Sequence, residues 1–382
     1  MALSRRLLLL LPITLVVLTG CDRASPDFGE AAEWSLSAEP TLVVGTEGAP
    51  TSEFHLVVGA FEFSTGDIAV VNGRPAEVRL FAPDGRFLHL LGREGAGPGE
   101  FRSMLWAASL ADTLVLWDQG LRRGTLLRPN GAVVTTVLLR PDDVPQGGWG
   151  TGLLPDHRWT IITNPLRSPR AQAGLHQDTL RLGLLSADGA GPLQEVGPVL
   201  TAPLVIADLG EERLAVTGSQ FGVGTLSLVL GDRIVLADGE SGTIRIFDAD
   251  GLPEREFEAP VARRPLTTAL LGELLTETLA SLPDTARWPL ARARHSRQFA
   301  PDRLPAFRRI LGDGERLFWL EAFPLRSGEP VVYHVVRDDG RLMARIEAPA
   351  GFQVLSVRDA SVLGIQTDAD GVQRVMRYGL SR

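Results

Sequence analysis

The feature that most constrains the fold of this chain is a turn sequence that occurs twice, 47 residues apart. Residues 45–60 read GTEGAPTSEFHLVVGA and residues 92–107 read GREGAGPGEFRSMLWA, with identity at seven aligned positions. Glycine and proline are the residues that turns require, and each copy follows a short apolar run. Self-similarity with a period of about 20 to 50 residues indicates a repeat architecture.

The second copy, GREGAGPGEF at 92–101, also suggests a loop that binds phosphate. Such a loop needs a Gly-Lys-Ser or Gly-Lys-Thr sequence, or a dinucleotide fingerprint, that leads into a helix. The residues after Phe101 are of the strand-forming type, and the stretch has a copy one period earlier. We therefore interpret it as a junction between structural repeats.

A second set of features repeats with the same period. Short strand-type runs such as DIAVVN, TLVLWD and RIVLAD each end on an acid or an amide, and these end residues are 46, 46, 74, 83 and 47 residues apart. Three spacings match the period of the turn sequence, and the other two indicate insertions. The end residues, called the polar tips below, are Asn72, Asp118, Asn164, Asp238, Glu321 and Asp368.

Most polar tips are followed by two further strand-type runs around a tight turn. These turns read PDG, PNG, DADG and DDG, and Asn-Gly and Asp-Gly are typical of β-hairpins. Six units of about 46 residues with several strands each match the blade of a β-propeller. The sequence RIVLADGESGTIRIFDADG at 233–251 and the GPGEF turn resemble NHL-type repeats. From about residue 34 to 380 the chain resembles a six-bladed β-propeller lipoprotein of that kind, most weakly in the third blade at 148–197.

The predicted fold class is therefore all-β, with one six-bladed propeller over residues 34–382. The strand-type residues at 40–45 have no earlier blade, whereas the C-terminal part supplies three strands without a fourth. We expect 40–45 to complete the last blade and close the ring, because a missing strand would leave sheet edges exposed.

The N-terminus predicts export and lipid anchoring. Arg5 and Arg6 precede an apolar run, and the sequence LTGC ends at Cys21, the only cysteine. This resembles a bacterial lipoprotein signal at 1–20, which implies acylation of Cys21 and a short polar tether at 21–33; the alternative is an uncleaved anchor or an ordinary secretory signal. Two or more acyl chains hold a protein stably on a membrane. We expect an extracytoplasmic protein on the inner or outer membrane of a bacterium.

An insertion of about 262–304 separates the fourth and fifth blades. Leucines at helical spacing predict a helix at 267–282, and Pro283 ends it. Arginines follow, among them Arg292, Arg294 and Arg297. One interpretation is a helix packed on the propeller with solvated arginines. The other is a lid or partner-docking arm for an anionic group, since guanidinium groups bind carboxylate and phosphate in a bidentate manner.

The polar tips are the candidate ligand or metal site. If each ends the second strand of its blade, all lie on one face around the mouth of a channel, where oxygen ligands could bind Ca²⁺. The alternative, which the repeated turn favours, is that each side chain bonds its own turn backbone. The six histidines lack the spacing of a metal site.

These patterns leave the function between two classes. The first is a binding or scaffold module at the cell envelope for a small molecule or an envelope protein, for which the sequence identifies no catalytic residue and no cofactor beyond the Ca²⁺ considered above. The second is a metal-dependent lactonase, lyase or hydrolase with its site at the channel mouth. The formal net charge of -8 argues against nucleic acid as a partner.

Overall fold

The computed structural model describes residues 32–45, 53–139, 148–163, 172–210, 213–314, 316–326, 328–368 and 371–382. The predicted signal peptide, Cys21, most of the tether and Asn164 lie outside these residues.

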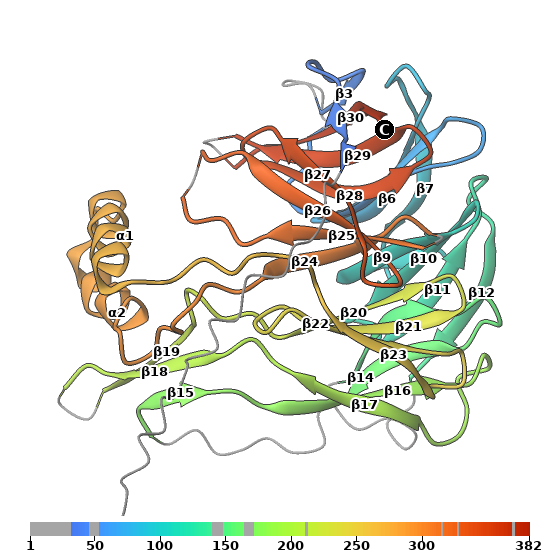
Figure 1. Ribbon diagram of the computed structural model, residues 1–382. Helices are drawn as coiled ribbons and strands as arrows, with labels where there is room; N and C mark the ends of the chain where they lie inside the picture. Colours follow the sequence, from blue (N-terminus) through green and yellow to red (C-terminus); the bar gives the residue numbers. More distant parts are fainter. Residues whose placement is uncertain are drawn as a thin grey trace, which may run out of the picture.

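The described chain is built mainly from small antiparallel sheets (Figure 1). In six of them, at least three neighbouring strands follow one another directly in the chain. The one interruption is β15, which comes between β14 and β16 in the sequence but belongs to another sheet. The first two sheets contain β4 (Val57–Glu62), β5 (Ile68–Gly73), β6 (Ala76–Phe81) and β7 (Phe87–Glu94), then β9 (Met104–Leu110), β10 (Thr113–Asp118), β11 (Arg123–Leu127) and β12 (Val133–Leu138). The next two contain β13 (Trp149–Leu153), β14 (Trp159–Thr163), β16 (Thr179–Leu185) and β17 (Gln194–Leu200), then β20 (Thr225–Leu230), β21 (Arg233–Asp238), β22 (Thr243–Phe247) and β23 (Pro253–Glu258). The last two contain β24 (Phe307–Gly312), β25 (Leu317–Ala322), β26 (Val331–Arg337) and β27 (Leu342–Ala348), then β28 (Phe352–Arg358), β29 (Ser361–Thr367) and β30 (Gln373–Ser381).

The first strands of the six sheets contact one another in cyclic order. β4 contacts β9, and the contacts continue through β13, β20, β24 and β28 back to β4. The second strands are apolar and buried along most of their length, as in IAVVNG of β5, because both of their faces pack against neighbouring sheets. This arrangement of small sheets around a common axis is that of a β-propeller.

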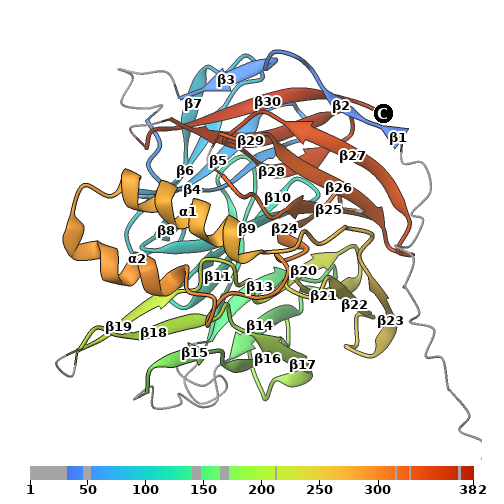
Figure 2. The same cartoon turned by 60° about the vertical axis from the view of Figure 1, so that its left-hand side comes forward.

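The first described segment of the chain joins the last sheets. β3 (Leu42–Val44) pairs antiparallel with β30, where Leu42 lies opposite Arg377 and Val44 opposite Val375. The short strands β1 (Ala32–Glu33) and β2 (Ser35–Leu36) pair with β27 and β30. The N-terminal and C-terminal parts of the chain therefore lie side by side, as Figures 1 and 2 both show.

Large aromatic side chains fill the space between neighbouring sheets. The rings of Trp117 and Trp159 are buried with centroids 5.9 Å apart. Each ring lies on a glycine of the other sheet: a Cβ atom at Gly124 would be 2.4 Å from Trp159, and one at Gly150 would be 2.6 Å from Trp117. The sheets approach closely at these positions because glycine has no side chain.

Antiparallel order separates the connections onto two faces of the ring. The turns between second and third strands, and the connections from one sheet to the next, leave at the same end of the sheets. We call this end the connection face, and the opposite end, with the other hairpin turns, the hairpin face. Within the described residues, the insertions with secondary structure all belong to the connection face. They are β8 (Glu100–Phe101), β15 (Gly174–His176), the pair β18 (Leu204–Asp208) and β19 (Leu214–Gly218), which forms one sheet with β15, and a helical unit.

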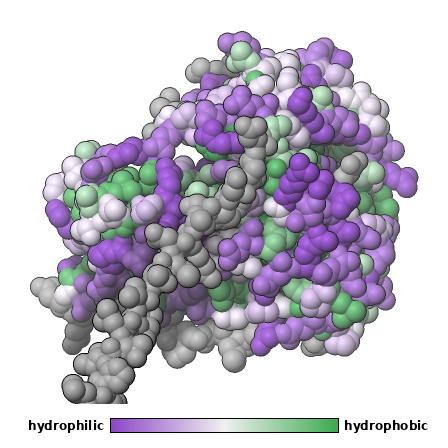
Figure 3. Space-filling model, in the orientation of Figure 1, coloured by the Kyte–Doolittle hydropathy of each residue, from purple (hydrophilic) through white to green (hydrophobic). Residues whose placement is uncertain are grey.

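The helical unit contains α1 (Thr268–Ser281), a 3-10 turn (Thr285–Arg287) and α2 (Trp288–Arg294) between β23 and β24. Thr267 caps α1, since its hydroxyl accepts a hydrogen bond from the N–H of Leu270 at 3.2 Å. Leu271 and Leu274 are buried in a cluster with residues of the insertion and the propeller. α2 contacts β18 and β19, so the helices stand beside the three-stranded sheet (Figure 2). The face seen in Figure 3 is mostly hydrophilic, with apolar groups gathered on the helical unit.

The turn GREGAGPGEF lies between the first and second sheets, where β7 and β8 pair in parallel. Its backbone N–H groups do bind an anion, the carboxylate of Glu100 in the same turn. The N–H groups of Ala96 and Gly97 donate to it at 3.1 and 2.9 Å, and Arg93 pairs with it at 2.9 Å. The hydrogen bond from Gly97 is the main cause that lowers the pKa of Glu100. The turn is therefore a structural junction whose backbone N–H groups bind the carboxylate of its own Glu100.

Candidate functional site

Four of the described polar tips, Asn72, Asp118, Asp238 and Asp368, use their side chains to hold backbone turns. Asp118 accepts hydrogen bonds from the N–H groups of Arg102 at 2.7 Å, Ser103 at 3.2 Å and Leu121 at 3.0 Å. Asp238 accepts from Glu240 at 2.9 Å. These carboxylates fix the turns that leave the second strands of their sheets.

Asn72 and Asp368 also hold the turns that follow their strands. The amide of Asn72 donates to the carbonyl of Arg74 at 2.8 Å, and Asp368 accepts from the N–H of Val372 at 2.9 Å. Asn72 and Asp118 are fully buried, whereas Asp368 also pairs with Arg374 at 3.3 Å. Within the described residues, no group of three or more His, Cys, Asp or Glu side chains is placed to hold a metal ion.

Glu321 is the tip that differs from the others. Its carboxylate is fully buried in β25 and pairs with the guanidinium groups of Arg308 and Arg309, the latter at 3.3 Å. It also accepts a hydrogen bond from the hydroxyl of Tyr333 at 3.1 Å. Burial, with the charge of Glu321 as a further cause, raises the pKa of Tyr333. Glu321 therefore positions side chains of the first strand rather than a turn.

A cavity with a volume of about 510 Å³ lies at the centre of the ring. Residues from all six first strands line it, together with hairpin-face turns at Ala111, Pro155 and Gly231. The cavity therefore lies toward the hairpin face, whereas the polar tips belong to the opposite end of the second strands. Its apolar lining includes Val58, Phe61, Trp106, Leu226, Leu228, Leu311, Leu355 and Val357.

Arg309 and Asp313 are the charged residues among those that line the central cavity in the described chain. The carboxylate of Asp313 accepts from the N–H groups of Arg316 and Leu317, at 3.1 and 3.0 Å. Arg309 donates to the carbonyl of Val354 at 3.1 Å and pairs with Glu321. One tip predicted from the sequence is thus linked through Arg309 to the cavity, whereas nothing in the repeat pattern pointed to Arg309.

The three arginines predicted as anion contacts have different surroundings and partners in the structure. Arg297 donates to the carbonyl groups of Leu266 at 2.8 Å and Pro301 at 3.1 Å and pairs with Asp302, so it holds the base of the insertion. The guanidinium of Arg292 lies 6.0 Å from the ring centroid of Trp288 and is exposed. The Nε atom of Arg294 is buried without a hydrogen-bond partner in the described residues.

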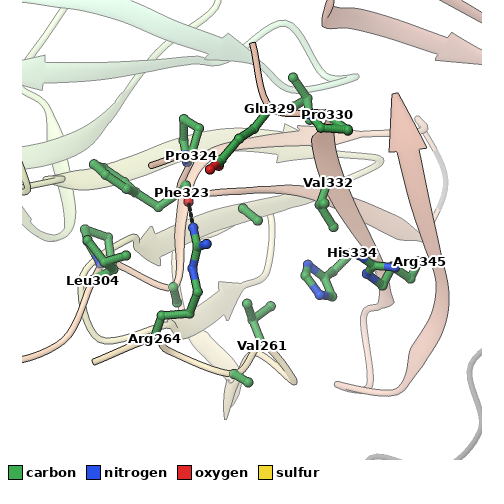
Figure 4. Close-up of a pocket in the computed structure, with 15 residues that line it drawn as sticks. Val261, Arg264, Leu304, Phe323, Pro324, Glu329, Pro330, Val332, His334 and Arg345 are labelled. Atoms are coloured by element: carbon green, nitrogen blue, oxygen red, sulfur yellow. Dashed lines mark hydrogen bonds between the residues drawn. The ribbon is translucent and has the colours of Figure 1, made fainter. Parts of the chain in front are cut away.

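A second pocket, with a volume of about 240 Å³, lies where the helical insertion leaves the propeller (Figure 4). Arg264 and Leu304 belong to its two connecting segments, which are joined by a hydrogen bond from the N–H of Leu304 to the carbonyl of Arg264 at 2.8 Å. Arg264 also donates to the carbonyl of Phe323 at 2.8 Å. We call this cavity the stem pocket.

His334, a residue of the third strand β26, is among the residues that line the stem pocket. His334 lies opposite Arg345 of β27 in the sheet register. Its Nδ1 atom is buried and has no hydrogen-bond partner in the described part of the chain. Burial, helped by the charge of Arg345, lowers the pKa of His334 to about 4, so the imidazole is neutral at pH 7.

Comparison with known proteins supports the fold. No family profile matches the chain. The RING finger protein nhl-1 of Caenorhabditis elegans is 32% identical over 89 residues, which are 23% of this chain but 9% of that protein. A solved structure of a member of the DUF4221 family from Bacteroides vulgatus superposes with a TM-score of 0.56 at 8% identity, over 92% of this chain and 100% of that one. A putative exported protein from Bacteroides fragilis gives 0.48 at 10% identity, over 91% and 95%. The chain is a β-propeller protein, and at these identities the structural likeness concerns the fold alone.

In the described part of the chain, no helix combines the length and the apolar character needed to cross a membrane.

Proposed function

We propose that this protein is a lipid-anchored, extracytoplasmic binding module that holds a small apolar molecule in the central cavity of a six-bladed propeller. The observation that carries the proposal is the central cavity itself. Binding sites in proteins are typically concave, mostly apolar and furnished with few polar groups, and about 300 to 1,000 Å³ in volume. The central cavity, at about 510 Å³, lies within this range of volume, and apolar side chains form the larger part of its lining.

The arrangement of the ring supports the same conclusion. Six sheets with first strands in cyclic contact, and β3 paired with β30, support a closed ring in which each sheet is one blade. A closed ring fixes the lining side chains on strands rather than on loops. Such a rigid apolar cavity binds its ligand with little loss of conformational entropy.

The lining also indicates what the ligand must offer. Serine and threonine hydroxyls at Ser109, Thr151 and Ser227 supply hydrogen-bonding groups among apolar side chains. Arg309 supplies one positive charge, held in place by Glu321 and by the carbonyl of Val354. We infer a mainly apolar ligand with one carbonyl or acidic group.

The first experiment measures binding of N-phenyl-1-naphthylamine, a neutral apolar dye that fluoresces when it leaves water. We expect saturable fluorescence with the natural protein and at least a tenfold weaker affinity with Ser227→Trp, because the indole fills part of the cavity. Ser103→Trp, on the exposed connection face, is the matched control and leaves the affinity unchanged. Equal affinity in all three proteins would place the dye elsewhere and overturn the proposal.

The second experiment tests the anchor. Cys21→Ser removes the sulfur that the lipid is attached to, so the protein is expected to move from the membrane fraction to the soluble fraction. Two acyl chains give stable attachment, and a protein without them has no comparable hold on the bilayer. Membrane and soluble fractions are compared by immunoblot, and continued membrane attachment of Cys21→Ser would exclude acylation at Cys21 as the anchor.

A further inference from the structure

The stem pocket has features of a built binding site that is separate from the central cavity. Three prolines, Pro305, Pro324 and Pro330, form part of its wall. Proline fixes its own φ angle, so these wall segments have few alternative conformations. The prolines therefore restrict the conformations that the pocket wall can adopt.

Opposite charges meet in one part of this pocket. In Figure 4 the side chains of Arg264 and Glu329 reach into the same region from two different segments. Arg264 is oriented by the carbonyl of Phe323, and Glu329 accepts a longer hydrogen bond from the N–H of Leu325 at 3.4 Å. No ion pair between Arg264 and Glu329 is formed in the described structure, so each can take a partner of opposite charge.

Apart from Arg345, whose guanidinium pairs with Glu347, the remainder of the stem pocket is mostly apolar, with the neutral His334 among its lining residues. Val261 and Val332 lie between the charged region and His334 (Figure 4). The buried Nδ1 atom of His334 needs a hydrogen-bond partner, because an unsatisfied buried polar atom costs about 1 to 3 kcal/mol.

We infer that the stem pocket binds a free α-amino acid, whose carboxylate pairs with Arg264 and whose ammonium group pairs with Glu329. The two charged groups of an α-amino acid are attached to one carbon atom, so they require a positive and a negative side chain close together. The side chain of the ligand lies along Val261 and Val332 toward His334. A volume of about 240 Å³ suits such a small molecule and is below that of most drug-sized sites.

An anion without an ammonium group is a poorer match to this site. Glu329 would repel a simple carboxylate or phosphate, and burying its charge without a partner is unfavourable. Arg345 does not replace Arg264, because its guanidinium already pairs with Glu347 at 2.7 Å on the surface. The presence of Arg264 and Glu329 in one region of the pocket is thus what selects a zwitterion.

The experiment begins with a thermal-shift screen of the standard L-amino acids at millimolar concentration, since a ligand that binds the native state raises the melting temperature. The best amino acid is then titrated by calorimetry beside its amide, which lacks the carboxylate, and its N-acetyl derivative, which lacks the ammonium group. We expect both derivatives to bind at least tenfold more weakly. These measurements use the natural protein, so they do not depend on the folding of any variant.

Two substitutions locate the site. Glu329→Gln and Arg264→Gln are each expected to weaken binding of the amino acid at least tenfold, whereas Arg341→Gln, in the turn before β27 and outside the pocket, leaves it unchanged. The absence of a shift with any amino acid would overturn the inference. So would equal binding of the N-acetyl derivative, or binding that survives both pocket substitutions. Binding at the central cavity is measured separately with the dye. A negative result in one assay therefore does not affect the proposal that the other assay tests.

Discussion

At the scale of single residues, the polar tips act as internal supports. The carboxylate of Asp118 receives three backbone N–H groups, from Arg102 and Ser103 at the end of one connection and from Leu121 in the next turn. The three hydrogen bonds meet on a carboxylate that is itself fully buried at the end of the second strand. The residue thus joins the first and second strands of its sheet to the turn after the second strand.

Replacing this carboxylate is expected to be costly. Asp118→Ala leaves three N–H groups without their acceptor, and each unsatisfied buried group costs about 1 to 3 kcal/mol. We expect the free energy of unfolding to fall by about 3 kcal/mol or more, as measured by urea denaturation. Asp118→Asn keeps one acceptor oxygen, so we expect its free energy of unfolding to lie between those of the natural protein and Asp118→Ala.

The matched control is Asp84→Ala, since Asp84 makes a similar bond to Arg86 in an exposed turn at 3.0 Å. Its loss is expected to cost less than about 1 kcal/mol, because water replaces the acceptor. If Asp118→Ala were as mild as Asp84→Ala, the view of Asp118 as a buried support would be wrong.

At the scale of secondary structure, sequence and structure agree best where the pattern is local. The leucine stripe and Pro283 predicted a helix at 267–282, and α1 spans Thr268–Ser281. No pattern in the sequence indicated α2 or the sheet of β15, β18 and β19. β15 pairs with β18 about 30 residues further on, and pairing between distant segments leaves no periodic signal in either one.

The packing of neighbouring sheets depends on glycine as much as on tryptophan. Gly124→Ala places a methyl group within 2.4 Å of the buried Trp159 ring, which has no free space to move into. Overpacking of this kind typically costs about 1 to 3 kcal/mol, and we expect Gly124→Ala to lower the free energy of unfolding by that amount.

Gly218→Ala in β19 is the control for this substitution, because nothing lies within 4 Å of a Cβ atom there. Both variants are compared by urea denaturation followed by tryptophan fluorescence. Equal stability of the two would show that the second and third sheets tolerate a wider spacing than we infer.

At the scale of the whole molecule, the pairing of β3 with β30 determines how the two ends of the chain are held. Leu42 and Val44 are buried against residues of both the first and last sheets. Without β3, the outer edge of the last sheet would be exposed along Val375–Arg377, and exposed edges favour aggregation.

Two truncations separate this role from that of the other N-terminal strands. A chain that starts at residue 46 loses β3 and is expected to lose about 3 kcal/mol or more of stability, since each buried leucine or valine contributes about 1.5 to 3 kcal/mol. A chain that starts at residue 38 keeps β3 and is expected to stay close to the natural protein. Thermal melting and light scattering measure stability and aggregation, and similar behaviour of both chains would argue against ring closure by β3.

The sequence alone determined the β-propeller character of this protein, its repeat junctions, the strand ends at the polar tips and the position of α1. These features depend on residues close together in the chain, where turn chemistry and apolar periodicity leave a readable pattern. Only the tertiary structure decided that Glu321 binds Arg309 rather than a turn, that the central cavity lies toward the opposite face from the tips, and that Arg264, Glu329 and His334 share one pocket. Such residues come together through sheet packing and insertion docking, and no spacing in the sequence records those contacts.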